Sequence, residues 1–255
     1  MPFTFSHPAA VAAVWPGARR FPLPFAAIAI GTMTPDFEFF FHLRPVSLVS
    51  HSLFGLFFFC VPAGFVVTLL WERVAKTPTR ALLGMSTERV QAWGDVLTLR
   101  TVIAILLGAV THLLWDGLTH GGYWGVRYFP ALLDPAMTFR GAAVPWFNLL
   151  QHTSTIAGGL LVLGWLVRAT RRDGDIRGLL RANWRTGAIA AIALFALVAG
   201  ALNGLRGPYP DTFWSAQRWL GRVATGAMLG LGVGTIAFAW LFERGAIGPR
   251  PEQRS

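Results

Sequence analysis

The sequence contains a single cysteine, Cys60, and this residue lies inside an apolar run. One cysteine excludes an intramolecular disulfide, and it also excludes a cysteine-rich metal site. Any metal that this chain binds is therefore expected to be held by histidine and carboxylate side chains.

Charged residues are also scarce, since Asp, Glu, Lys and Arg make up only 13% of the chain. Soluble domains carry about a quarter charged residues. Here 54% of the residues are hydrophobic and the mean hydropathy is +0.51, which is typical of an integral membrane protein. The sequence also holds no Walker motif and no serine nucleophile elbow, so it gives no support to nucleotide binding or serine hydrolysis.

Five apolar runs approach the length of about 20 residues that a membrane-crossing helix needs. The stretch of residues 21–34 is shorter, so we predict a re-entrant or interfacial segment there rather than a crossing. The expected fold is an all-α polytopic bundle in one membrane domain, with residues 1–51 as an N-terminal cap, 52–242 as the bundle and 243–255 as a polar tail. The predicted spans are Ser52–Trp71, Thr101–Leu118, Leu149–Val167, Thr186–Leu202 and Val223–Phe242.

Two serines are predicted to cap helices. Ser6 precedes His-Pro, which favours the start of a short helix running to about Trp15. Ser50 is predicted to cap the first span, with His51 in its first turn. After that span, residues 72–100 are predicted to form a charged loop.

Most Lys and Arg residues lie in the loops 72–100 and 168–185 and in the C-terminal tail, whereas the long connection 119–148 carries few. The positive-inside rule places the basic loops in the cytoplasm. We interpret the net charge of +10 as a topology signal and as contact with anionic lipid. The expected partner is therefore the lipid bilayer, and no nucleic acid is expected.

The segment THLLWDGLTH, at the end of the second predicted span, carries the clearest chemical pattern. His112, Asp116 and His120 recur every four residues, and each such step turns a helix by only ~40°, so they form one stripe. A carboxylate at the end of a membrane helix needs a partner. Two imidazoles beside it suit a divalent ion, or two ions that the carboxylate bridges. The alternative is that all three are polar residues at a helix end, wetted by the interface.

The predicted topology brings more histidines to the same extracytoplasmic face. His51 begins the first span and His152 begins the third. His7 joins them if residues 21–34 do not cross the membrane, and Asp36 lies near His51 in the sequence. Scattered structural histidines have no reason to collect at one face, which favours a shared site.

Two residues near this face are assigned differently. Glu38 is a candidate catalytic residue with Asp116, either as a general base or as a partner that orients a ligand. An alternative is that Glu38 is a solvated residue at the membrane edge. His42 follows three phenylalanines and is interpreted as an interfacial residue outside the site.

Four ordered segments, MPFTFSHPAA, MTPDFEFF, SHSLFGLF and THLLWDGLTH, resemble a family of bacterial polytopic membrane proteins known only as a domain of unknown function. The resemblance covers most of the chain. It implies a multi-pass protein of the bacterial cytoplasmic (inner) membrane, and it assigns no activity.

The order of the His and Asp residues is also similar to that of two hydrolase groups. These are the inner-membrane metal-dependent hydrolases of the YdjM type and the all-helical zinc-dependent phospholipase C and single-strand nuclease fold. The resemblance implies a divalent metal cofactor, with zinc expected first and manganese second. Carried over by motif, Asp36, His51, His112 and Asp116 hold one metal, His7 joins Asp116 on a second, and His120 and His152 are candidates for another.

This chain departs from the soluble enzymes at two points. They have a carboxylate one turn after the late histidine, where this chain has Ile156, and they use an N-terminal tryptophan that this chain lacks. These departures predict one or two metal ions rather than three.

Three functions remain open from the sequence. The first is a membrane-embedded metal-dependent hydrolase, acting at the extracytoplasmic face on a lipid phosphoester. The second is a carrier that handles metal ions or protons, and the third is a scaffold without chemistry. A carrier predicts polar residues deep in several spans, and the last two spans offer almost none.

Overall fold

The computed structural model describes residues 4–11, 15, 20–86, 93–174 and 183–249. Within these residues, five helices are long and apolar enough to cross a membrane, and each overlaps one predicted span. The chain is therefore an all-α, multi-pass membrane bundle. The five helices are Leu53–Leu82, Leu99–Thr119, Trp146–Asp173, Trp184–Leu205 and Phe213–Glu243.

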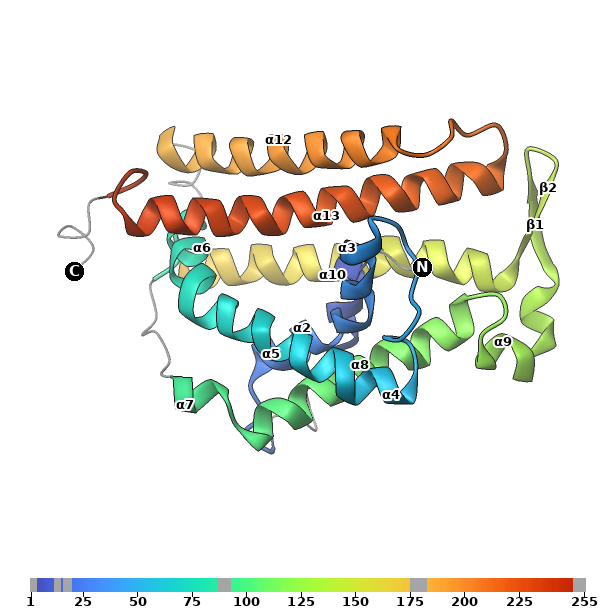
Figure 1. Cartoon of the computed structure of the whole chain (residues 1–255), viewed down its shortest axis with the longest axis horizontal. Helices are drawn as coiled ribbons and strands as arrows, with labels where there is room; N and C mark the ends of the chain where they lie inside the picture. The colour runs from blue at the N-terminus through green and yellow to red at the C-terminus, as the bar shows by residue number, and fades with distance from the viewer. Residues whose placement is uncertain (1–3, 12–14, 16–19, 87–92, 175–182, 250–255) are drawn as a thin grey trace.

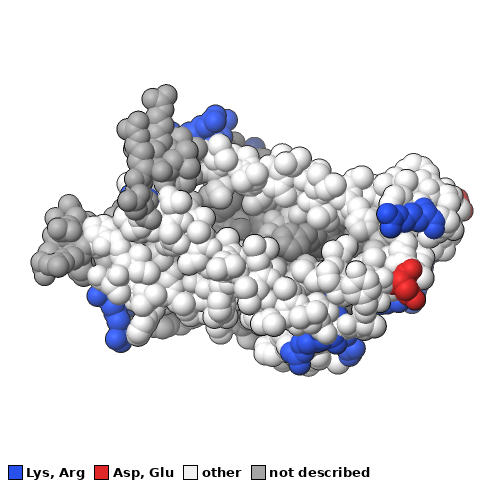
Figure 2. All heavy atoms as spheres, turned by 90° about the horizontal axis from the view of Figure 1, so that it is seen from above, with Lys and Arg blue, Asp and Glu red and all other residues white. Residues whose placement is uncertain are grey.

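The surface of the bundle fits a lipid environment. Figure 2 shows one face of the molecule on which charged side chains are few and most of the surface is uncharged. Large apolar side chains such as Phe58, Leu160 and Leu197 are more than half exposed. Because exposed apolar area of this kind is unfavourable in water, lipid is the environment that covers it.

The first span is a continuous helical run rather than an ideal α-helix. Two of its parts, η3 and η4, are π-helical, which widens the turns there. The run continues through Glu72 and Lys76, whose side chains form an ion pair of 3.0 Å, so the prediction of a loop from residue 72 was wrong. Its parts are α4 (Leu53–Gly55), η3 (Leu56–Cys60), α5 (Val61–Leu70), η4 (Trp71–Ala75) and α6 (Lys76–Leu82).

Both predicted serine helix caps were wrong, because neither serine occupies an N-cap position. The Ser52 side chain, not that of Ser50, accepts the hydrogen bond from the Gly55 backbone N–H that caps the first span. Ser6 lies inside the 3-10 helix η1 (Thr4–Ala10), and its hydroxyl donates to the Thr155 carbonyl of another helix. Residues 12–14 of the predicted N-terminal helix lie outside the described residues.

Three of the long helices, α10, α12 and α13, run along the long axis of the molecule, and α8 and the first span are inclined to them (Figure 1). Figure 1 shows α12 and α13 side by side, with the small β1–β2 hairpin and α9 at one end of the bundle and α6 at the other. The long helices after the first span are α8 (Leu99–Thr119), α10 (Trp146–Asp173), α12 (Asn183–Leu205) and α13 (Phe213–Glu243), and the short helix α7 (Trp93–Val96) precedes α8.

The connection between α8 and α10 contains an antiparallel hairpin that the sequence did not predict. Its two-residue turn, Arg140 and Gly141, has φ angles of +48° and +78°, the left-handed conformation that a tight hairpin turn requires. The elements of this connection are α9 (Trp124–Tyr128), η5 (Pro130–Leu133), β1 (Pro135–Phe139) and β2 (Ala142–Pro145).

The N-terminal apolar segment forms α2 (Phe25–Gly31), which has seven residues. Such a helix is only ~10 Å long, so it cannot cross a hydrocarbon core of ~30 Å. It packs against α5 and α8 inside the molecule. It is followed by η2 (Thr34–Phe37) and α3 (Glu38–His42), which carry the acidic candidates of the site.

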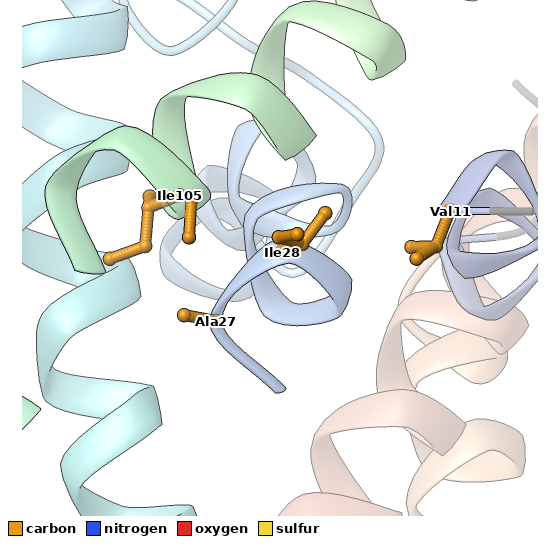
Figure 3. Packing of buried hydrophobic residues seen from close by; sticks show 5 residues of the cluster. Val11, Ala27, Ile28 and Ile105 are labelled. Atoms are coloured by element: carbon orange, nitrogen blue, oxygen red, sulfur yellow. The ribbon is translucent and has the colours of Figure 1, made fainter. Parts of the chain in front are cut away.

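Two glycines let α2 and α8 touch through their backbones. A Cβ atom on Gly31 would lie 2.4 Å from the Ile105 carbonyl oxygen, and one on Gly108 would lie 2.3 Å from the Ile28 carbonyl oxygen. Figure 3 shows the buried side chains of Val11, Ala27, Ile28 and Ile105 around this contact. The close approach fixes η2 beside the C-terminal half of α8, where the site lies.

Candidate metal centre

Four side chains from three separate segments meet in one buried group. Asp36 comes from η2, His51 precedes the first span, and His112 and Asp116 lie one turn apart on α8. One ligand atom from each lies within 4.8 Å of all the others. Asp36, His112 and Asp116 are at most 1% exposed, and the His51 side chain is 7% exposed.

The four separations between a histidine nitrogen and a carboxylate oxygen are close to the edge lengths of a coordination tetrahedron. His112 Nε2 lies 3.5 Å from Asp36 Oδ1 and 3.3 Å from Asp116 Oδ2. His51 Nε2 lies 3.8 Å and 3.5 Å from the same two oxygens. Ligands about 2.0–2.2 Å from a tetrahedral ion lie ~3.3–3.6 Å from one another. The separations exceed those of good N–H···O hydrogen bonds, so a shared ion explains them better than direct pairing.

Outer partners occupy the ligand atoms that face away from the group. His112 Nδ1 donates to the Thr32 carbonyl at 2.8 Å, which leaves the lone pair of Nε2 for the group. Asp36 Oδ2 accepts a hydrogen bond of 2.6 Å from the Thr4 hydroxyl, and His51 Nδ1 lies 3.0 Å from the Ser50 hydroxyl. Partners of this kind orient metal ligands and fix the histidine tautomer.

Most of the inward-facing atoms, by contrast, have no hydrogen-bond partner within the described part of the chain. A buried polar atom without a partner is costly, so several in one place form an arrangement that a bound cation would satisfy. The unpartnered buried atoms are Asp36 Oδ1, His112 Nε2 and both Asp116 carboxylate oxygens within the group, and His7 Nε2 and His120 Nε2 beside it. The residues present therefore fit one divalent ion between Asp36, His51, His112 and Asp116.

His7 and His120 lie on the edge of this group. His7 Nε2 is 3.6 Å from Asp116 Oδ1, and the His7 ring stacks on the His112 ring at 3.8 Å. His120 Nδ1 donates to the Asp116 carbonyl at 3.1 Å. Asp116 Oδ2 thus faces His51 and His112, whereas its Oδ1 faces His7.

The predicted three-residue helical stripe is correct for only two of its members. α8 ends at Thr119, and His120 is its C-terminal cap with an extended backbone at φ −128° and ψ 127°. The His120 side chain turns back toward Asp116 because of this cap conformation and not because of helical spacing.

Burial favours the neutral form of the His7 and His120 imidazoles, which is the form that binds metal. Burial lowers the pKa of His7 well below its usual value, and His112 lowers it further, while Asp116 opposes them. Burial also lowers the pKa of His120 to about 4, against the opposing effect of Asp116. Burial raises the pKa of the Asp36 carboxyl, with His112 opposing, so the ionised form of Asp36 gains from a bound cation.

Glu38 holds the backbone just before His51. Its two carboxylate oxygens accept hydrogen bonds from the backbone N–H groups of Leu48, Val49 and Ser50, at 2.8 to 3.3 Å. Burial raises the pKa of the Glu38 carboxyl, but these hydrogen bonds outweigh burial and lower the pKa to about 2. The carboxylate is thus ionised at neutral pH and sets the path of the chain into His51.

Glu38→Gln is expected to lower metal affinity about tenfold, since the loss of an orienting partner typically costs 10–100-fold. The amide of glutamine keeps one acceptor and turns an N–H donor toward backbone N–H groups, which loosens the segment before His51. Metal titration of the purified protein measures the change. The matched control is Glu72→Gln, which removes a buried carboxylate in the first span; an equal loss of affinity in both variants would contradict a local role for Glu38.

The structure gives two other histidines different surroundings. His152 is exposed on α10, and its Nε2 lies 2.7 Å from the Gln217 side-chain nitrogen. The four-residue ligand group does not include it. His42 Nε2 lies 3.6 Å from Glu38 Oε1 at the end of α3, and it too is outside the group.

Sequence reasoning did not find the outer partners Thr4, Thr32 and Ser50. Thr4 and Thr32 lie 32 and 80 residues from the ligands they contact, and threonine is common in membrane helices. No local pattern marks a threonine whose carbonyl or hydroxyl orients a distant ligand.

One protein-family model matches nearly the whole chain. The model of the family described as "Domain of unknown function (DUF4184)" matches residues 1–240, which include every residue of the group. The chain belongs to this family. No curated protein and no solved structure matches the chain. The chemistry of the site is therefore argued from its own geometry.

Proposed function

We propose that this protein is a membrane-embedded, metal-dependent hydrolase of phosphoesters. The observation that carries the proposal is the buried group of Asp36, His51, His112 and Asp116, in which one ligand atom of each residue lies within 4.8 Å of the others and the facing atoms of Asp36, His112 and Asp116 have no hydrogen-bond partner among the described residues. Two imidazoles and two carboxylates suit Zn²⁺ first and Mn²⁺ second. A divalent ion bound there supplies Lewis-acid chemistry that offsets the charge developing on a phosphoester.

The chain's own residues have distinct roles in this proposal. Asp36, His51 and His112 hold the ion on one side, while Asp116 supplies the carboxylate that serves the centre and faces His7. His7 and His120 are proposed to complete a second, neighbouring position. Glu38 acts as a positioning residue through the backbone before His51, rather than as a base.

We infer that the site faces the extracytoplasmic side of the bacterial inner membrane. His112 and Asp116 lie in the last turns of α8, toward the end of the bundle that carries α9 and the hairpin (Figure 1). The connection at that end carries only Arg127 and Arg140 as basic residues. The helix ends and connections at the other end, in residues 73–100 and 168–185, are richer in Lys and Arg, which favours the cytoplasm for them.

The proposal predicts about one or two equivalents of zinc or manganese per chain when the protein is purified in detergent without chelator. Elemental analysis measures the metal, and hydrolysis of bis(p-nitrophenyl) phosphate before and after chelator treatment measures the activity. Loss of turnover on chelation and its return with zinc is the expected result. Protein without metal would favour the scaffold, and metal without turnover on this or a lipid phosphoester would favour the metal carrier.

A further inference from the structure

A hollow of about 570 Å³ lies directly beside the candidate metal centre. Tyr123 connects the two, because it lines the hollow and its ring centroid lies 6.3 Å from that of His51 and 5.3 Å from that of His120. The hollow therefore shares one side chain with the surroundings of the centre. The residues that line the hollow are Gly122, Tyr123, Trp124, Arg127 and Tyr128.

Close packing fixes the position of this hollow relative to the metal ligands. A Cβ atom on Gly117 would lie 2.4 Å from the Trp124 indole nitrogen, and one on Gly125 would lie 2.6 Å from the Gly117 carbonyl oxygen. Gly117 directly follows Asp116 on α8. The short helix α9 is thus packed closely on the end of α8, next to the residue that follows Asp116.

Arg127 is the one cation among the residues that line the hollow, and it is exposed. Within the part of the chain that the structure describes, it forms no ion pair with a carboxylate. A guanidinium offers a planar fork of donors that matches two oxygens of a phosphate. An exposed arginine that lines this hollow is therefore suited to an anionic group of the substrate.

The other side chains of the hollow place it at a membrane interface. Tyr128 is 78% exposed and Trp124 is 44% exposed, and the next residue, Phe129, is 57% exposed. Exposed Trp and Tyr at the end of a membrane helix are typical of the lipid headgroup level. An arginine at this level therefore lies beside the phosphate groups of the lipids.

We propose that this hollow binds the phosphate of a membrane lipid headgroup, with Arg127 pairing with the phosphate oxygens and Tyr123 lying against both the hollow and the rings of His51 and His120. This inference rests on the proposed function and names its substrate class as a phospholipid in the bilayer. Arg127 is a binding and specificity residue in this assignment, and it takes no part in holding metal.

The test uses the full-length protein, purified without chelator, in phosphatidylcholine nanodiscs. Titration calorimetry measures the binding of dihexanoylphosphatidic acid to wild type, Arg127→Gln, Arg127→Lys and Arg140→Gln. Arg127→Gln is expected to weaken binding about tenfold, because a charge-assisted pair is lost. Arg127→Lys should recover part of the affinity, and Arg140→Gln, which removes an equal charge from the nearby hairpin turn, should leave it unchanged.

Three outcomes overturn the inference. If wild type and Arg127→Gln bind the lipid with equal affinity, the hollow is not the binding site. If the Arg127 and Arg140 variants weaken binding equally, the effect comes from the overall positive charge and not from the hollow. Inorganic phosphate that binds as tightly as the lipid, with the same dependence on Arg127, assigns the hollow to free phosphate instead. Metal content measured in the same samples tests the hydrolase proposal separately from the lipid-binding proposal. Absence of metal contradicts the hydrolase, whereas the effect of Arg127→Gln on lipid binding still tests the hollow.

Discussion

Asp116→Asn is expected to remove most of the bound metal and all metal-dependent turnover while leaving the protein inserted and folded. Asparagine keeps the size of the side chain but loses the charge that balances the ion, and its amide nitrogen is no ligand. Asp116 Oδ2 faces both His51 and His112, and Oδ1 faces His7, so one change removes a shared ligand. Affinity should fall by at least about a hundredfold, since even an orienting partner of a ligand is worth 10–100-fold.

The measurement is metal per protein in detergent, with helix content and elution profile recorded for each variant. His120→Ala should lower metal content less, because His120 lies at the edge of the group. His42→Ala is the control and should leave metal content unchanged, since His42 contacts Glu38 outside the ligand group. Equal metal in wild type and Asp116→Asn would refute the metal centre and favour a scaffold.

Gly108→Ala is expected to destabilise the protein and lower its metal content together. The added Cβ would lie 2.3 Å from the Ile28 carbonyl oxygen and 2.6 Å from the Thr32 backbone nitrogen, so α2 must move away from α8. Overpacking of this kind costs about 1–3 kcal/mol, and more where backbone cannot yield. The movement also displaces Thr32, whose carbonyl accepts the hydrogen bond that orients His112.

The thermal midpoint in detergent and the metal content of the same samples measure both effects. Gly164→Ala is the matched control, because Gly164 lies on α10 and a Cβ there has nothing within 4 Å. That change should be neutral or slightly stabilising, since alanine favours a helix over glycine. If Gly108→Ala keeps the midpoint and the metal of the control, the α2–α8 contact does not position the centre.

The sequence by itself determined the membrane architecture. Whether a helix crosses a bilayer depends on its own length and polarity, and both are local properties of the chain. The same locality let the short run of residues 21–34 be separated from the five spans, and α2 has only seven residues. The proximity of His112 and Asp116 could equally be predicted from the sequence, because helical periodicity alone puts residues four apart on one face.

The wider ligand set came from family resemblance, since no local rule connects Asp36 and His51 with α8. Only the tertiary structure decided which predicted residues share the group, bringing Asp36 and His51 to α8 and leaving His152 beside Gln217. It also replaced Ser50 by Ser52 as the helix cap, because a cap depends on where the chain turns into the helix.

The outer partners depended on tertiary structure most of all. The Thr32 carbonyl contacts His112 only because Gly31 and Gly108 allow the backbones of α2 and α8 to touch. Glu38 contacts the segment before His51 only because the chain turns after α3. Such contacts join residues far apart in the chain, so their energies are set by packing that no local pattern encodes. Local hydrophobicity therefore fixed the spans of this protein, and close packing between helices fixed its centre.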